Sequence, residues 1–199
     1  MNYLELSREN VKNECIKFEK NIKNEYEYDL IIFVAKGAYY IGKFLSEIDN
    51  TPLLMISATR KGNSLKKILK PFLKLVPKKI QIFLREKEMN SSYHKKNNDR
   101  VISFDEVSWN EYKNKKNILI VDDSIDTGNS IEQVYKVVKK YYSNSNVEVA
   151  VFNCMENATF KPRFSLYTNT MINGPWSNDS NYNAEFISEY KDWKNQNGI

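Results

Sequence analysis

Unbroken apolar stretches recur along this chain and constrain its fold more than any other feature. The segments 29–35 and 117–121 are apolar at every position after the first, so a strand formed there has two apolar faces to bury. Strands of this kind belong to parallel sheets that are covered by helices on both sides. The segments 52–57 and 147–152 are predicted to add further strands to the same sheet.

Segments with helical periodicity alternate with these strands. Helices are predicted over 7–25, where Ser7 can cap the first turn, and over 38–48 and 129–142. The first helix has one apolar stripe, which is formed by Val11, Cys15, Phe18 and Ile22. Because strands and helices alternate, we predict one α/β domain over 1–199 with a doubly wound, mainly parallel sheet.

The core of this domain, expected at about 28–175, is interrupted by an unusual segment at about 60–100. Residues 60–79 carry basic side chains and no acidic one, and apolar residues recur within them at helical spacing. We expect a helical insertion whose basic face is solvated. The alternative is a basic amphipathic surface over 62–90 that makes a peripheral contact with anionic lipid or an acidic partner.

Several classes of protein can be excluded. Every apolar run is far shorter than the roughly 20 residues of a transmembrane segment, and the charged N-terminal residues do not resemble a secretory signal. Two distant cysteines, Cys15 and Cys154, and the single histidine, His94, argue against a disulfide framework or a zinc site. The net charge of +5 comes mainly from lysine, which is abundant throughout the chain together with Asn, Ile and Tyr, so we do not take it as evidence for a nucleic-acid partner. We therefore expect a cytoplasmic protein with free thiols and no nucleic-acid partner.

The clearest chemical signal follows the apolar strand at 117–121. The strand is predicted to end in Asp122 and Asp123, and a short loop then opens a helix. Backbone N–H groups at a helix N-terminus can hold a phosphate, with help from the hydroxyls of Thr127 and Ser130. Adjacent carboxylates can accept hydrogen bonds from two ribose hydroxyls or help to hold Mg²⁺. An EF-hand loop with Gly128 as its turn glycine would place Ile125 and Thr127 where an acid or amide ligand is usual, and the glycine patterns of a Walker A loop and a dinucleotide fingerprint are missing here.

Residues 121–130, VDDSIDTGNS, resemble the phosphoribosyl-pyrophosphate (PRPP) signature of type I phosphoribosyltransferases. The resemblance implies that the two adjacent acids bind the ribose hydroxyls and that the following residues wrap the 5-phosphate. These following residues are Asp126, Thr127, Gly128, Asn129 and Ser130. The resemblance also implies Mg²⁺ as cofactor, a homodimer, and Asp126 as a general base near the acceptor.

A second match supports the first. Lys36, Gly37 and Ala38 follow the strand at 29–35 and resemble the pyrophosphate-binding loop of the hypoxanthine-guanine branch. That loop usually reads Lys-Gly-Gly and often contains a cis peptide bond. Arg60, which follows the strand at 52–57, is expected to reach the pyrophosphate as well.

The C-terminal part matches the hood that covers the base in xanthine-guanine enzymes, and we expect this hood at about 160–199. The residues TMINGPWS at 170–177 carry this resemblance. It implies acceptor contacts from Lys161, Met171, Ile172 and Trp176, and a metal contact from Asp179 beside Asp122 and Asp123. Met171 stands where those enzymes place the aromatic residue that stacks on a purine, and Trp176 also fits an ordinary core position.

Together these motifs predict transfer of the 5-phosphoribosyl group from Mg-PRPP to a 6-oxopurine base, with release of pyrophosphate. Two alternatives stay open at this point. The acceptor of the transfer can instead be a sugar, a polyol or a lipid-linked intermediate. The chain can also be a non-catalytic regulator that binds PRPP.

Overall fold

The structure, a computed structural model, describes residues 2–60 and 100–199. The chain divides into two compact units, of which the first comprises residues 1–58 and 102–199 and the second comprises residues 59–101. The second unit covers the segment predicted as an insertion. The helices and the basic surface expected there lie outside the described residues, as do His94 and the side chain of Arg60.

The main sheet has six strands in the order β4-β3-β2-β5-β6-β7. Their bounds are β2 Leu30–Ala35, β3 Leu53–Arg60, β4 Arg100–Ser103, β5 Asn117–Ile125, β6 Asn146–Cys154 and β7 Phe164–Thr168. Strand β2 pairs in parallel with β3 and β5, and β6 pairs in parallel with β5 and β7. The prediction of a mainly parallel sheet is therefore confirmed.

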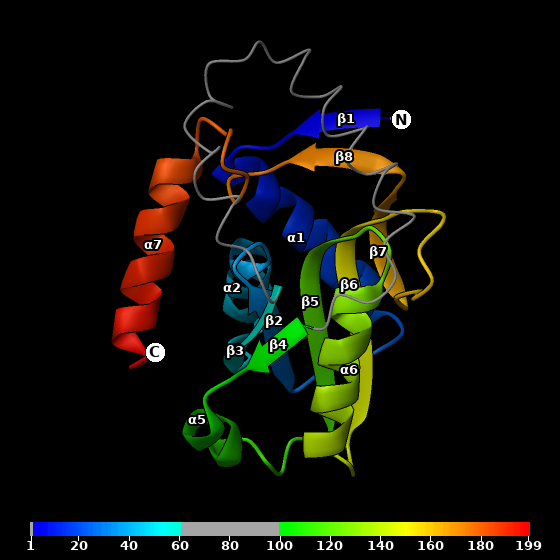
Figure 1. Ribbon diagram of the computed structural model, residues 1–199, viewed down its shortest axis with the longest axis vertical. Helices are drawn as coiled ribbons and strands as arrows, with labels where there is room; N and C mark the ends of the chain where they lie inside the picture. Colours follow the sequence, from blue (N-terminus) through cyan, green and yellow to red (C-terminus); the bar gives the residue numbers. More distant parts are fainter. Residues whose placement is uncertain (1, 61–99) are drawn as a thin grey trace. The chain divides into compact units, whose positions relative to one another are not determined.

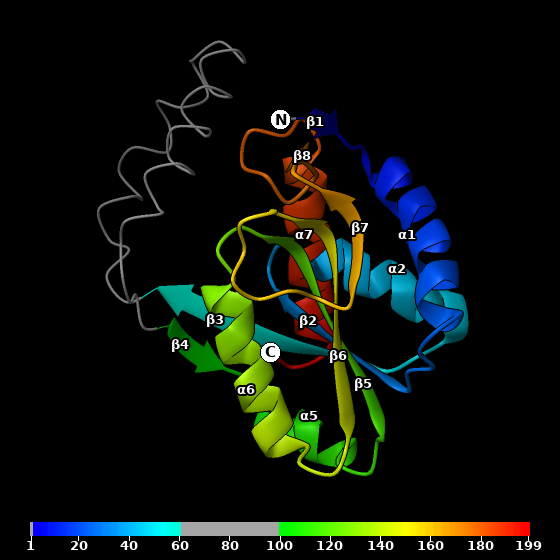
Figure 2. The same cartoon turned by 90° about the vertical axis from the view of Figure 1, so that its right-hand side faces the viewer.

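Helices cover both faces of this sheet, as Figures 1 and 2 show for the first unit. The helices are α1 Arg8–Lys23, α2 Tyr39–Asp49, α5 Glu106–Glu111, α6 Asn129–Tyr141 and α7 Asn183–Gln196. Phe33 and Leu119 pack on one face, in the apolar cluster with α1, α2 and α7. Ile32 and Ile120 pack on the other face, in the cluster with α5 and α6. The side chains of successive strand residues thus point alternately into two apolar cores, which explains why the strands have no polar face.

Helix α1 shows how closely local sequence and packing agree. Its apolar stripe, predicted from spacing, is buried in full: Val11, Cys15, Phe18 and Ile22. Its first turn is closed by a capping box, in which the hydroxyl of Ser7 accepts from the Asn10 backbone N–H at 3.1 Å. In the described part of the chain, no helix is long and apolar enough to cross a membrane.

One strand is longer than the sequence predicts. Strand β5 was expected to end at Val121, but it continues to Ile125 because β6 also extends and Cys154 pairs with Ile125. Asp122 and Asp123 therefore lie inside a strand and not beyond its end. The backbone that holds them is fixed by its neighbours in the sheet.

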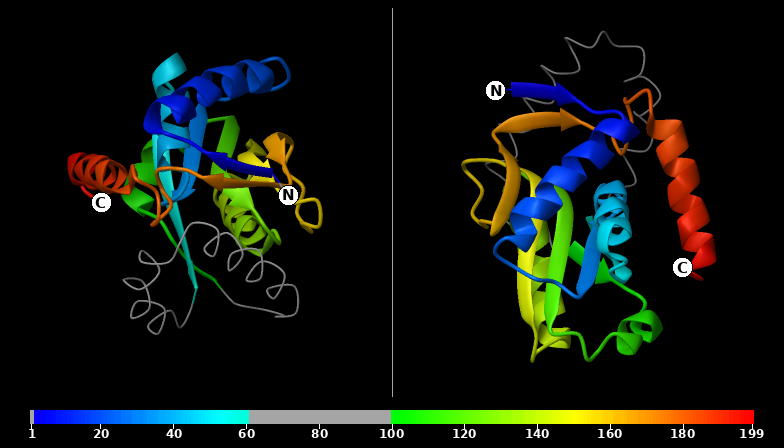
Figure 3. Two further views of the ribbon diagram at one scale, coloured as in Figure 1. Left: turned by 90° about the horizontal axis from the view of Figure 1, so that it is seen from above. Right: turned by 180° about the vertical axis from the view of Figure 1, so that it is seen from behind.

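The structure adds a strand that the sequence did not predict. Strand β8, Thr170–Asn173, lies within the segment expected to form the hood, and it pairs in parallel with β1, Asn2–Glu5. Figures 1 and 3 show this pair at the end of the first unit where α6 begins. The N-terminal strand was missed because four residues are too short to reveal a period, and its partner lies at the other end of the sequence.

Candidate active site

Two helices begin side by side at the carboxyl edge of the main sheet. The turn 36–38 connects β2 to α2, and residues 126–128 connect β5 to α6, while β2 and β5 are neighbours in the sheet. Neither helix has a side-chain cap, whereas α1 and α5 are capped by Ser7 and Asp105. Helix α7 also lacks such a cap. Uncapped N–H groups and the positive end of the helix dipole favour an anion at both starts, α2 and α6.

The acid pair lies between these two helix starts. Asp122 is only 8% exposed, Asp123 is partly exposed, and the Asp123 backbone N–H donates to Oδ1 of Asp122 at 2.9 Å. Burial raises the pKa of Asp122 well above its ordinary value, and the nearby charge of Asp123 raises it further. Burial also raises the pKa of Asp123, and the charge of Asp126 adds to this. The ionised pair is thus disfavoured until hydroxyl donors or cations approach it.

The turn after β2 contacts the Asp123 carboxylate of this pair. A Cβ atom built on Gly37 would lie 2.3 Å from Oδ1 of Asp123, so a side chain at this position collides with the carboxylate. The structure therefore brings together two motifs that are far apart in the sequence. The peptide bond between Ala35 and Lys36 is cis, as the resemblance implies for this loop. Ala38 has φ −81°, so glycine is not required where the family usually has its second one.

The residues that precede α6 form what we call the phosphate loop, residues 126–130. Gly128 has φ +96°, and a Cβ atom there would lie 2.7 Å from the backbone nitrogen of Phe160. Only glycine fits both conditions. Asp126 and Asn129 are exposed at this loop. Thr127 and Ser130 are partly exposed, so their hydroxyls can also reach a ligand.

The predicted acceptor residues lie in different surroundings. Trp176 is 8% exposed, folds over Gly174 and has its ring centroid 6.3 Å from that of Phe152 in the core. Met171 is buried in β8, and Ile172 packs against the same core cluster as Trp176. Lys161 is exposed, and its ammonium group donates to the carbonyl oxygen of Glu156 at 2.6 Å.

The metal ligands predicted from the sequence can be tested against this geometry. Among residues 2–60 and 100–199, no three His, Cys, Asp or Glu side chains gather closely enough to hold a metal ion. Asp179 therefore does not complete a group of three with Asp122 and Asp123. Mg²⁺ is commonly held by one or two carboxylates, with water and substrate phosphates as further ligands. The acid pair fits that mode of binding.

Sequence reasoning missed the contacts made by the segment 155–163, which we call the β6–β7 loop. Thr159 in this loop donates to the carbonyl oxygen of Thr127. At the end of β6, the amide oxygen of Asn153 accepts from the Thr170 backbone N–H at 2.9 Å and ties the sheet to the hood strand. No spacing rule points to either residue, because both act through backbone groups that are distant in sequence.

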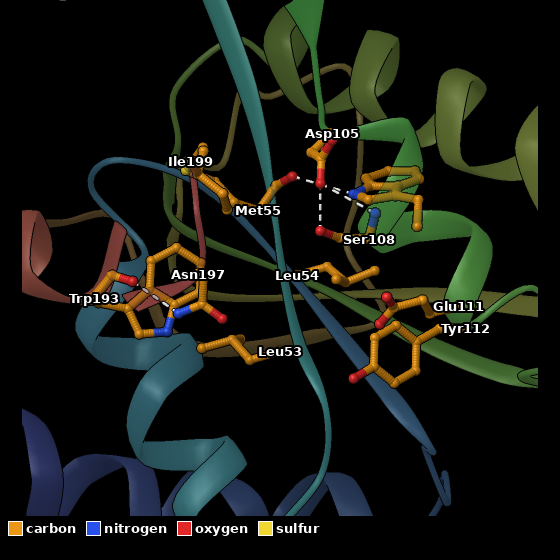
Figure 4. Close-up of a pocket in the computed structure, with 11 residues that line it drawn as sticks. Leu53, Leu54, Met55, Asp105, Ser108, Glu111, Tyr112, Trp193, Asn197 and Ile199 are labelled. Carbon is orange, nitrogen blue, oxygen red and sulfur yellow. Dashed lines mark hydrogen bonds between the residues drawn. The ribbon is translucent and has the colours of Figure 1, made fainter. Parts of the chain in front are cut away.

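A small hollow lies at another place in the first unit. It measures about 90 Å³ and is formed by the start of β3, helix α5 and the end of α7 (Figure 4). Its polar groups are engaged within the chain: Asp105 accepts from the Ser108 N–H at 3.1 Å, and Trp109 donates to the Met55 carbonyl at 3.3 Å. Because it lies at the amino end of its strand, it is separate from the acid pair.

A doubly wound sheet that presents an acid pair between two uncapped helix starts, with a hood at the same end, has the architecture of type I phosphoribosyltransferases. The sequence model of the phosphoribosyl transferase domain matches residues 3–180. The chain therefore belongs to the phosphoribosyltransferase family and is a transferase of that class.

Solved structures share this fold at low sequence identity. A purine phosphoribosyltransferase from Pyrococcus horikoshii is 20% identical, with a TM-score of 0.60 over 89% of this chain and 95% of that one. The xanthine-guanine-hypoxanthine phosphoribosyltransferase of Helicobacter pylori is 16% identical, with a TM-score of 0.63 over 94% and 99%. A Neisseria gonorrhoeae protein with bound ppGpp is 16% identical, with a TM-score of 0.61 over 96% of each chain. No curated protein matches the sequence.

Proposed function

We propose that this transferase moves the 5-phosphoribosyl group from Mg-PRPP to a 6-oxopurine base and releases pyrophosphate. One observation carries the proposal: buried Asp122 and partly exposed Asp123 lie in β5 next to two uncapped helix starts, with Gly37 of the turn before α2 against Asp123 and with α6 following β5 in the chain. PRPP carries a ribose diol between a 5-phosphate and a pyrophosphate. The order of groups in the substrate therefore matches the order of binding groups in the protein.

Each part of PRPP has a partner in this proposal. Asp122 and Asp123 accept hydrogen bonds from the 2- and 3-hydroxyls of the ribose. The first-turn N–H groups of α6, with the hydroxyls of Thr127 and Ser130, bind the 5-phosphate. The turn that contains Lys36 and the start of α2 bind the pyrophosphate.

The protein's main contribution to the reaction is electrostatic. As the bond from C1 to the pyrophosphate breaks, negative charge grows on the leaving group and positive charge grows on the ribose ring. Lys36 and the N–H groups of α2 stabilise the leaving group. Asp122 and Asp123 would hold Mg²⁺, which would supply further positive charge to offset the charge of the leaving group. Asp126, exposed beside the phosphate loop, is the group proposed to take the proton from the acceptor.

The choice of a 6-oxopurine as acceptor is supported by the neighbours in fold. Two of them are purine-specific by name, and a third binds ppGpp, which is a guanine nucleotide. In this chain the hood strand supplies Met171 and Ile172, and we propose that these two, with Lys161 and with Trp176 behind them, line the acceptor site. We further propose a homodimer that acts in the cytoplasm, where Cys15 and Cys154 stay free thiols.

Release of pyrophosphate from PRPP tests this function directly. The protein is incubated with Mg²⁺ and PRPP, and guanine, xanthine, hypoxanthine, adenine, uracil and orotate are added one at a time. We expect pyrophosphate only with the 6-oxopurines, together with the matching nucleotide. Pyrophosphate release with a sugar or polyol instead would change the acceptor class. PRPP binding without release for any acceptor would favour a regulator.

The contact between Gly37 and Asp123 leads to a further prediction. Gly37→Ala places a methyl group 2.3 Å from the carboxylate oxygen of Asp123, so either this carboxylate or the turn has to shift from its present position. We expect kcat/KM for PRPP to fall by about 100-fold, which is the loss that misplacement by about 1 Å can cause. Ala38→Gly is the matched control, because it changes the same turn without adding an atom. Equal kcat/KM values for Gly37→Ala and Ala38→Gly would show that this turn is not part of the PRPP site.

A further inference from the structure

The β6–β7 loop donates hydrogen bonds to the backbone of the phosphate loop. The carbonyl oxygen of Thr127 accepts two hydrogen bonds from Thr159, one from its backbone N–H at 3.0 Å and one from its hydroxyl at 2.7 Å. The carbonyl oxygen of Ile125 accepts from the Met155 N–H at 2.9 Å. Two donors of Thr159 therefore point at a carbonyl of the phosphate loop, and a third donor of the β6–β7 loop points at the last carbonyl of β5.

These hydrogen bonds determine where the adjacent N–H group points. In a trans peptide the C=O and the N–H project in opposite directions, and the described cis bond is at Ala35–Lys36 and not here. With the Thr127 carbonyl held by Thr159, the N–H of Gly128 faces away from the β6–β7 loop. If this peptide rotated, a carbonyl oxygen would replace the N–H on the ligand side and repel an anion.

The β6–β7 loop is itself anchored, so it can serve as a fixed support. The amide oxygen of Asn169 accepts from the Glu156 backbone N–H at 2.7 Å, and its amide nitrogen donates to the Glu156 carboxylate at 2.8 Å. On its other side, the backbone of Phe160 fills the space beside Gly128 that a side chain would need. The β6–β7 loop therefore connects the phosphate loop to Asn169, which lies between β7 and β8.

We propose that Thr159 is a positioning residue for the phosphate loop: its two hydrogen bonds to the Thr127 carbonyl orient the Thr127–Gly128 peptide so that the Gly128 N–H binds the 5-phosphate of PRPP. The inference rests on the proposed function of residues 126–130. It assigns a role to an exposed side chain whose hydroxyl contributes little to the core.

Three variants test this role. Thr159→Val keeps the shape of the side chain and removes the hydroxyl, whereas Thr159→Ser keeps the hydroxyl. Asn157→Ala changes another exposed residue of the same loop and is the matched control. Binding is measured by calorimetry with ribose 5-phosphate and, separately, with inorganic pyrophosphate, while thermal unfolding reports on the fold.

For Thr159→Val we expect ribose 5-phosphate to bind about three- to tenfold more weakly, which corresponds to the net loss of one hydrogen bond. Pyrophosphate binding is expected to stay unchanged, as are the unfolding midpoint and both affinities of the Asn157→Ala protein. Thr159→Ser is expected to bind ribose 5-phosphate within about twofold of the unaltered protein. In turnover, the KM for PRPP rises for Thr159→Val, while the KM for the acceptor does not.

Other results would overturn the inference in distinguishable ways. If the unaltered protein binds ribose 5-phosphate and Thr159→Val binds it equally well, Thr159 has no positioning role and the proposed function stands. If Thr159→Val and Thr159→Ser weaken the binding of ribose 5-phosphate equally, the hydroxyl is not the cause. The same holds if Thr159→Val weakens the binding of ribose 5-phosphate and of pyrophosphate equally. If the unaltered protein binds neither PRPP nor ribose 5-phosphate, the proposed function fails and the role of Thr159 fails with it.

Discussion

Replacement of both Asp122 and Asp123 by asparagine is expected to weaken the binding of Mg-PRPP by at least about 100-fold in calorimetry. Each carboxylate would lose a charge-assisted hydrogen bond to a ribose hydroxyl, and such a bond contributes about 1.5–3 kcal/mol. The substituted side chains keep their shape but carry no charge, so the affinity for a divalent cation at the site falls as well. Unchanged affinity of the double variant would falsify the assignment of the diol site.

The same double variant is expected to fold at least as stably as the unaltered protein. The pKa of each carboxyl is raised in the folded state, so the ionised pair costs stability at neutral pH, and that cost disappears as the pH falls through the raised pKa. Asparagine removes the cost at every pH. Thermal unfolding at pH 7 separates this outcome from a loss of fold, and Asp192→Asn on the exposed side of α7 is the control.

Gly128→Ala is expected to reduce kcat/KM for PRPP by about 100-fold, through a shift of the phosphate loop. The new methyl group would lie 2.7 Å from the backbone nitrogen of Phe160, and the φ of +96° disfavours any side chain there. Because the neighbouring atom belongs to the backbone, the phosphate loop itself has to move. A displacement of about 1 Å can reduce kcat/KM by about 100-fold, and the loss is measured with PRPP as the varied substrate.

Gly198 provides a matched control for this variant. It also has a positive φ, +69°, but a Cβ atom there would meet nothing within 4 Å. Gly198→Ala therefore shares the backbone strain without the collision, and we expect its kcat/KM to equal that of the unaltered protein. Full activity of Gly128→Ala would contradict the role of this glycine in the phosphate loop, whatever the control shows.

The elements of the main sheet and its flanking helices could be predicted because their signals are local. The apolar runs of β2 and β5 have no polar face, and the stripe of α1 repeats at helical spacing, so burial on both sides of a sheet follows from the residues alone. The signature at 121–130 is equally local. The acid pair and residues 126–130 could be proposed as binding residues because residues at the end of a strand and at the start of the next helix are consecutive in sequence.

The features that were missed depend on contacts between distant segments. Strand β1 has only four residues and pairs with β8 near the other end of the chain. The extension of β5 beyond Val121 depends on its pairing with β6. The sequence left two surroundings open for Trp176, the hood and the core, and only the packing shows that its ring lies against Phe152 in the core cluster.

The sequence by itself determined the class of fold and pointed to the residues that we propose to bind a phosphorylated ribose, because the spacing of apolar residues and a motif of consecutive residues can be recognised without the rest of the chain. The tertiary structure alone decided that Gly37 touches Asp123 and that Thr159 holds the Thr127 carbonyl. These contacts join segments that are distant in sequence, and they form only when the parallel sheet aligns the carboxyl ends of its strands.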